Sequence, residues 1–158
     1  MSRIATNSQR RIAAIAFAVL LTAGTAMAHE GATGVVAQRM DLMKQMGQHM
    51  KALGAMLAGK TVFDQETARR LAETMHQHCE HVMHMFPPGS DGHHSEATKA
   101  VWDRRPEFDD RMRRFDEAVE DLVAAAASGG KSELQSEFKR VGQECSGCHD
   151  GFRQKKSH

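Results

Sequence analysis

Apolar residues recur every three or four positions in four stretches of the chain, and each stretch predicts an amphipathic helix with one buried face. The first stretch runs over residues 36–57 and ends at Gly59, a residue suited to a helix C-terminus. The second follows Asp64, which favours the N-cap position, and Pro87-Pro88-Gly89 should end it. No stretch shows the period of two that is typical of a half-buried strand.

The second half of the chain continues this pattern. A third helix should begin near Pro106 and end at Ser128-Gly129-Gly130. A fourth should open on a capping box formed by Ser132 and Gln135 and continue to Arg153. Residues 87 to about 103 are predicted to form a long loop that packs on the bundle through Trp102. We therefore expect an all-α protein, an antiparallel up-down-up-down four-helix bundle with a single domain.

The candidate chemistry lies near the end of the last helix, in Cys145-Ser146-Gly147-Cys148-His149. C-x-x-C-H is the attachment signature of c-type haem, in which two thiols form thioethers and the histidine binds the iron. A thioredoxin-like pair would need a strand before the motif, and a zinc site would need further ligands at the usual spacing. A disulfide within one helical turn is geometrically awkward. One covalently attached haem c in the core, near one end of the bundle, is the favoured interpretation.

Residues 1–28 have the pattern of a secretory signal peptide. Three arginines precede an apolar stretch from Ile12 to Leu21, which is too short to span a bilayer, and Ala26-Met27-Ala28 fits a cleavage site. An uncleaved membrane anchor is the alternative. Cleavage would leave residues 29–158 as the mature domain, without a membrane span, and we expect it in the periplasm. Export agrees with haem attachment, which takes place outside the bacterial cytoplasm in most systems.

Charge and cysteine content narrow the classes of partner. Of the 21 basic residues, three lie in the predicted signal peptide, so the mature chain has 18 against 20 acidic residues. This balance does not favour binding to nucleic acid. Of the three cysteines, Cys79 lies outside the haem motif and falls on the apolar face of the second helix. It is interpreted as a small buried hydrophobe, with an intermolecular disulfide as the alternative.

The positions of these motifs resemble class II cytochromes c, the cytochrome c′ family. That family carries C-x-x-C-H near the C-terminus, followed after two residues by an aromatic residue and an arginine, as in Phe152 and Arg153. The resemblance also covers Arg39 to Gly47 of the first helix and the loop from Phe86 to Trp102. Ser146 stands where many members have lysine, and we expect only a local change of charge there.

The resemblance implies a periplasmic monohaem protein, not an enzyme, that occurs as a monomer or as a homodimer built on the first two helices. It implies that Cys145 and Cys148 hold the haem and that His149 is the proximal iron ligand. Arg39 matches an arginine near a haem propionate, and Arg153 matches one on the proximal side.

The residue on the other side of the iron decides the function that the resemblance implies. In five-coordinate members an apolar residue blocks this face, and those proteins bind nitric oxide or carbon monoxide. In the low-spin subgroup a methionine ligates the iron, and the protein transfers electrons to and from redox partner proteins. The decisive position here is Met43, although Met40, Met46 and Met50 share its helix and all four could be core filler. We expect His149/Met43 ligation and electron transfer, with gas binding as the alternative.

Six histidines crowd the second helix and the loop after it. His76, Glu80 and His84 follow one another at four-residue steps on one helical face, a spacing that can hold zinc, copper or nickel. An exposed polar face without a metal is the favoured interpretation, because the spacing shows no full ligand set of fixed geometry. The full set is His76, His78, His81, His84, His93 and His94.

Overall fold

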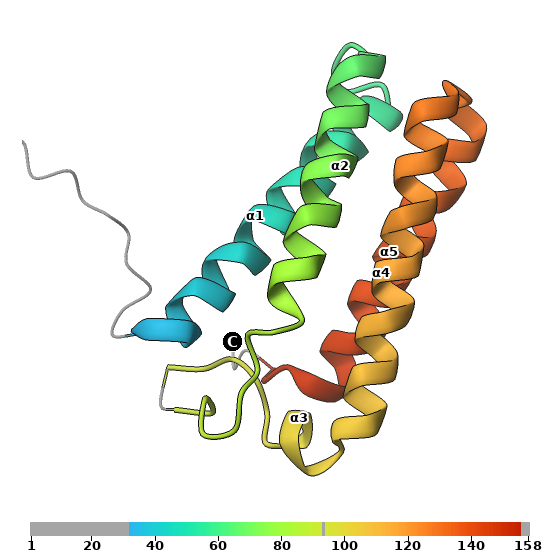
Figure 1. Cartoon of the computed structure of the whole chain (residues 1–158). Helices are drawn as coiled ribbons and strands as arrows, with labels where there is room; N and C mark the ends of the chain where they lie inside the picture. The colour runs from blue at the N-terminus through green and yellow to red at the C-terminus, as the bar shows by residue number, and fades with distance from the viewer. Residues whose placement is uncertain (1–31, 93, 156–158) are drawn as a thin grey trace, which may run out of the picture.

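The computed structural model describes residues 32–92 and 94–155, and all of its long secondary-structure elements are α-helices. Four long helices form the bundle and a one-turn helix precedes the third of them (Figure 1): α1 (Gly34–Leu57), α2 (Gln65–Val82), α3 (Ala100–Asp103), α4 (Arg105–Ser128) and α5 (Lys131–Phe152). The predicted all-α four-helix bundle is confirmed. The predicted signal peptide lies outside the described residues.

The four long helices close into a ring around one apolar core. α1 packs on α2 and α5, and α4 packs on α2 and α5. Leu53, Met75, Leu122 and Val141, one from each long helix, are at most 1% exposed. Each such side chain contributes roughly 1.5–3 kcal/mol when it leaves water, so this shared core holds the helices together.

Close packing of α1 on α5 depends on a glycine. A Cβ atom at Gly54 would lie 2.9 Å from Cζ of Phe138, which is closer than such atoms approach in proteins. The missing side chain therefore lets the Phe138 ring sit directly on the α1 backbone.

The predicted helix ends are correct where one residue type dominates the local geometry. The Asp64 carboxylate accepts a 2.8 Å hydrogen bond from the backbone N–H of Thr67, as an N-cap residue should. Gly59 and Gly129 follow α1 and α4 with φ of 71° and 78°, in the left-handed region where glycine carries no steric penalty.

Three local predictions were wrong. α5 begins at Lys131 with Gly130 as N-cap and no side-chain capping bond, so Ser132 and Gln135 form no capping box. Here Glu133 instead accepts a hydrogen bond from Ser128, across the turn from α4. α2 ends at Val82, five residues before Pro87. After it, the backbone N–H groups of His84 and Met85 donate to carbonyls only three residues back, which is the pattern of a 3₁₀ turn and not of an α-helix. The predicted loop also contains α3, whose first turn starts at residue 100.

The long connection between α2 and α4 packs on the bundle. Trp102 is partly buried against the core, as expected, and its indole N–H donates a 2.9 Å hydrogen bond to the carbonyl of Pro87 within the same connection. Ala97 and Arg153 form an antiparallel backbone bridge, and the N–H of Thr98 donates to the carbonyl of Phe152. The connection therefore lies against the C-terminal end of α5.

Within the described residues, none of the helices combines the length and apolar character that crossing a bilayer requires.

A stacked histidine pair joins α1 to α2. The rings of His49 and His78 lie 5.4 Å apart with an angle of 22° between them, and both Nδ1 atoms are buried without a hydrogen-bond partner. Burial lowers the pKa of both side chains. The charge of His78 lowers the pKa of His49 further, and the charge of His81 does the same for His78. Protonation of these two imidazoles is therefore less favourable in the folded protein than in the unfolded chain.

This pair predicts a loss of stability in weak acid. The unfolded chain takes up protons near pH 6.5, while the folded chain takes them up only at lower pH. Stability is therefore complete above about pH 6.5 and falls as the pH drops below it. Urea unfolding at pH 5.0 and 7.5 measures the difference, and His78→Gln should reduce it. An equal pH dependence in wild type and variant would contradict this assignment.

Candidate functional site

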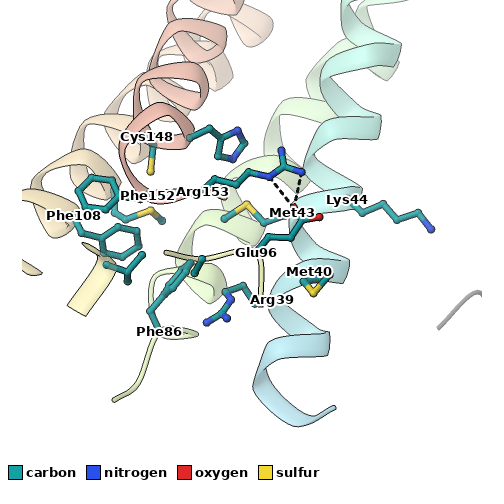
Figure 2. Close-up of a pocket in the computed structure, with 14 residues that line it drawn as sticks. Arg39, Met40, Met43, Lys44, Phe86, Glu96, Phe108, Cys148, Phe152 and Arg153 are labelled. Carbon is teal, nitrogen blue, oxygen red and sulfur yellow. Dashed lines mark hydrogen bonds and ion pairs between the residues drawn. The ribbon is translucent and has the colours of Figure 1, made fainter. Parts of the chain in front are cut away.

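Two adjoining cavities open at the end of the bundle where α1 begins and α5 ends, with volumes of about 380 and 240 Å³. Figure 2 shows the larger one, with side chains reaching it from the helices and from the α2–α4 connection. Both cavities are bordered by Met43, Met112, Cys148 and His149. These four residues therefore mark the place where the two spaces meet.

α5 brings the predicted attachment cysteines to this place. Cys145 lines the smaller cavity and Cys148 lines both, because residues three apart share one face of a helix. Both are free, half-buried thiols. Burial raises the pKa of each to about 11, so they are protonated at neutral pH and slow to form thiolate or disulfide before they react.

His149 lies next to Cys148 and lines both cavities, where it stays accessible to solvent. Burial by the surrounding protein lowers the pKa of its imidazole, and the charge of Arg153 lowers it further. The ring is thus kept neutral, the form in which histidine binds a metal.

Met43 approaches from the other wall of the site. It is half-buried, and among the four methionines of its stretch of α1 it is the one that lines both cavities. Met40 lines only the larger cavity, whereas Met46 and Met50 line only the smaller one. The structure thus places the predicted axial thioether at the same junction as the predicted axial imidazole.

Arg39 also borders the larger cavity, but its guanidinium holds the α2–α4 connection. The side chain is 3% exposed, and it donates hydrogen bonds of 2.8–3.2 Å to the carbonyls of Met85 and Ser90 and to the hydroxyls of Ser90 and Ser95. It also stacks over the Phe86 ring at 4.6 Å. Pairing of Arg39 with a haem propionate stays a prediction. The hydrogen bonds by which Arg39 holds the α2–α4 connection were not predicted from the sequence.

Arg153 and Glu96 form a second link between the site and the connection. Two nitrogens of Arg153 lie 2.6 and 2.7 Å from the same carboxylate oxygen of Glu96, and Figure 2 shows the pair at the cavity. The contact fixes the end of α5 one turn after His149.

Sequence reasoning also missed the contribution of α4 to the site. Phe108 and Met112 line the larger cavity, and the Phe108 ring packs edge-on against Phe86 and Phe152 with centroids 4.7 and 5.3 Å apart. Both residues belong to the apolar face predicted for the third helix. Helical spacing alone cannot separate a cofactor wall from ordinary core.

The histidines of the second helix do not come together as one group of metal ligands. Among the described residues, the only group of three or more potential metal ligands is His76 with Asp116 and Glu120 of α4, without His84. His78 instead stacks on His49. His93 lies outside the described residues.

Cys79 is fully buried, with its thiol pKa raised by burial, which agrees with its interpretation as a small hydrophobe.

The residues around the junction fit a c-type haem. The walls are mostly apolar, two thiols lie one helical turn apart, and an imidazole and a thioether border the same space. Lys44, Arg39 and Arg153 supply cationic groups at the larger cavity, where the propionates of a haem need partners.

Comparisons with known proteins agree with this fit. The family model described as cytochrome c′ matches residues 34–153. Cytochrome c′ from Rhodopseudomonas palustris is 34% identical over 152 residues, which cover 93% of this chain and 98% of that protein. The solved cytochrome c′ of Rubrivivax gelatinosus has a TM-score of 0.73 and 28% identity, with coverage of 76% of this chain and 94% of that one.

A cytochrome c′ variant from Alcaligenes xylosoxidans was solved as a nitric oxide complex. It has a TM-score of 0.73 and 25% identity, and the match covers 77% of this chain and 94% of that one. Family membership implies a covalently bound c-type haem, in agreement with the attachment motif on α5. The matches to the family model and to the Rhodopseudomonas protein both span most of this chain, so it belongs to the cytochrome c′ family.

Proposed function

We propose that this chain is a periplasmic protein that carries one haem c and binds a diatomic gas, such as nitric oxide or carbon monoxide, without being an enzyme. The observation that carries the proposal is the likeness to a cytochrome c′ variant solved with nitric oxide. A similar chain, also 25% identical, was solved with carbon monoxide bound. When bound, haem supplies an iron with two axial positions, one of which a gas molecule can occupy.

The protein's own residues prepare the two sides of the site differently. On the α5 side, Cys145 and Cys148 would hold the haem through thioethers, and His149 would offer an imidazole whose lowered pKa favours the neutral, metal-binding form. On the α1 side, Met43 stands among apolar neighbours. A methionine side chain is flexible, so it can fill this space and be moved aside by a small ligand.

Electron transfer is the second candidate function, because Met43 lines both cavities together with His149. A methionine–histidine pair would occupy both axial positions, raise the reduction potential and leave no free position for a gas. In this case the chain would exchange electrons with redox partner proteins. The comparisons favour gas binding over this reading.

Carbon monoxide titration of the reduced haem protein separates the two functions. Gas binding predicts a high-spin spectrum for the wild type and an adduct at micromolar carbon monoxide. Met43→Leu should then change the affinity by less than about tenfold, or roughly 1.4 kcal/mol, because no iron–sulfur bond is lost.

A different result would establish the second candidate. A low-spin wild type with a methionine-to-iron band in the red, which takes up carbon monoxide only after Met43→Leu, would overturn the gas-binding proposal. Met40→Leu is the matched control, because Met40 shares the helix with Met43 but lines only one cavity. It should leave the spectrum unchanged under either function.

A further inference from the structure

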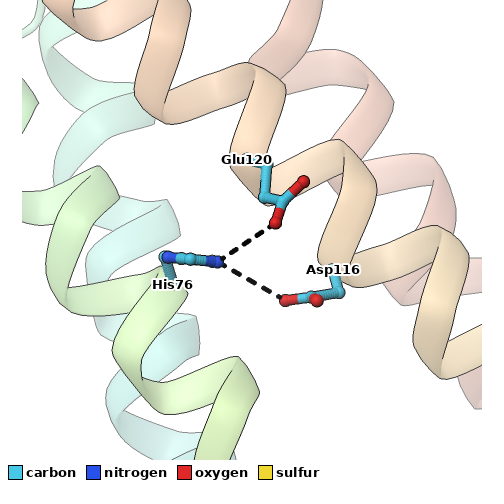
Figure 3. Close-up of side chains that lie close together, drawn as sticks. All are labelled: His76, Asp116 and Glu120. Atoms are coloured by element: carbon cyan, nitrogen blue, oxygen red, sulfur yellow. Dashed lines mark ion pairs between the residues drawn. The ribbon is translucent and has the colours of Figure 1, made fainter.

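A second group of metal-ligating side chains lies between α2 and α4, and none of its members lines the two cavities of the haem site. His76 projects from α2 toward Asp116 and Glu120, which lie four residues apart on one face of α4 (Figure 3). We propose that His76, Asp116 and Glu120 bind a divalent transition-metal ion of the zinc class that bridges the two helices.

The distances between the three groups fit a shared ion better than hydrogen bonds. Nε2 of His76 lies 3.6 Å from Oε1 of Glu120 and 3.8 Å from Oδ1 of Asp116, and all three ligand atoms lie within 4.8 Å of one another. Hydrogen bonds of this kind are shorter, at about 2.7–3.2 Å. Ligand atoms at about 2.0–2.2 Å from a tetrahedral zinc ion lie roughly 3.3–3.6 Å apart, so the two contacts of His76 need only a small inward movement.

The surroundings of Asp116 also favour the binding of a cation. Its Oδ1 atom is buried and has no hydrogen-bond partner, although the side chain as a whole retains about a quarter of its exposure. Among the described residues, the ion pairs of Asp116 and Glu120 are all made with His76. Two carboxylates lie side by side on α4 here, and a bound divalent cation would neutralise both.

The donor set indicates which ions can bind. One imidazole nitrogen and two carboxylate oxygens suit zinc and the neighbouring divalent first-row ions, whereas a thiolate-seeking ion would find no sulfur among these three side chains. Three protein ligands leave at least one position for water. Zinc accepts this tetrahedral set of nitrogen and oxygen ligands and has no redox chemistry, so zinc is the appropriate probe.

Isothermal titration of the haem-loaded protein with zinc chloride tests the proposal. We expect one zinc per chain at micromolar affinity, and at least a tenfold loss of affinity in both His76→Gln and Asp116→Asn. His84→Gln is the matched control, because it removes an exposed histidine two helical turns along the same predicted face. It should leave the affinity unchanged.

Thermal unfolding gives an independent measurement. Zinc should raise the unfolding midpoint of the wild type and of His84→Gln, since the ion binds only when α2 and α4 are packed together. The midpoint of His76→Gln should not respond, while its unchanged haem spectrum shows that the variant is folded. Absence of heat at micromolar zinc, or equal binding by wild type and His76→Gln, would overturn the proposal and leave His76 as an ordinary surface ion pair.

Discussion

Replacing both Cys145 and Cys148 with alanine should yield protein that loses all its pigment to acidified organic solvent, whereas the wild type keeps its haem. The two thioethers are the only covalent links predicted between the chain and the cofactor. Without them, the iron–histidine bond and the apolar walls would hold the haem only reversibly. The measurement is the haem absorbance that remains with the precipitated protein after extraction.

Cys79→Ala provides the matched control for this experiment. Cys79 is fully buried on α2 and lines neither cavity, so its removal should leave covalent haem unchanged. Retention of covalent haem by the variant that lacks both Cys145 and Cys148 would contradict the assignment. Loss of haem from Cys79→Ala would show instead that this cysteine takes part in attachment.

Replacing Arg39 with methionine should lower the free energy of unfolding by at least about 1.5–3 kcal/mol, because several buried acceptors lose a charged donor. The substitution would leave the carbonyls of Met85 and Ser90 and the hydroxyl of Ser95 without their donor. Hydrogen bonds to a charged group contribute about 1.5–3 kcal/mol each, although such values do not add. Methionine keeps much of the volume, so the loss would reflect the lost donors.

Urea unfolding measures this loss, and limited proteolysis locates it. We expect the first cleavage in the variant to fall within residues 86–98, because Arg39 no longer holds that segment against α1. Lys44→Met is the matched control: it removes a cation from the same helix and the same cavity, but Lys44 is exposed. A variant at residue 39 as stable as the Lys44 variant would contradict the anchoring function.

The bundle could be predicted from the sequence because its main signals are local. The spacing of apolar residues needs only one helix to be visible, and glycines such as Gly129 mark where a helix must end. The attachment motif is also local, since Cys145, Cys148 and His149 lie within five residues. The wrong capping box has a local cause too: Gly130 takes the N-cap position of α5, two residues before the serine that matched the motif.

The remaining features depend on contacts between residues that are distant in the sequence. The partners of Arg39 lie 46 to 56 positions away, and no spacing rule connects them. The same limit applies to His76: its spacing indicates partners on its own helix, whereas Asp116 faces it from the next long helix. Met43 could be selected among its neighbours only through the family resemblance, because all four methionines have the same side chain.

The wall of the haem site that faces α5 comes entirely from residues that precede it in the chain. α1, the α2–α4 connection and α4 all precede Cys145 in the chain, and these segments contact one another through Arg39 and through Phe86 and Phe108. Docking of α5 therefore closes the site and brings both thiols and the imidazole against its remaining walls.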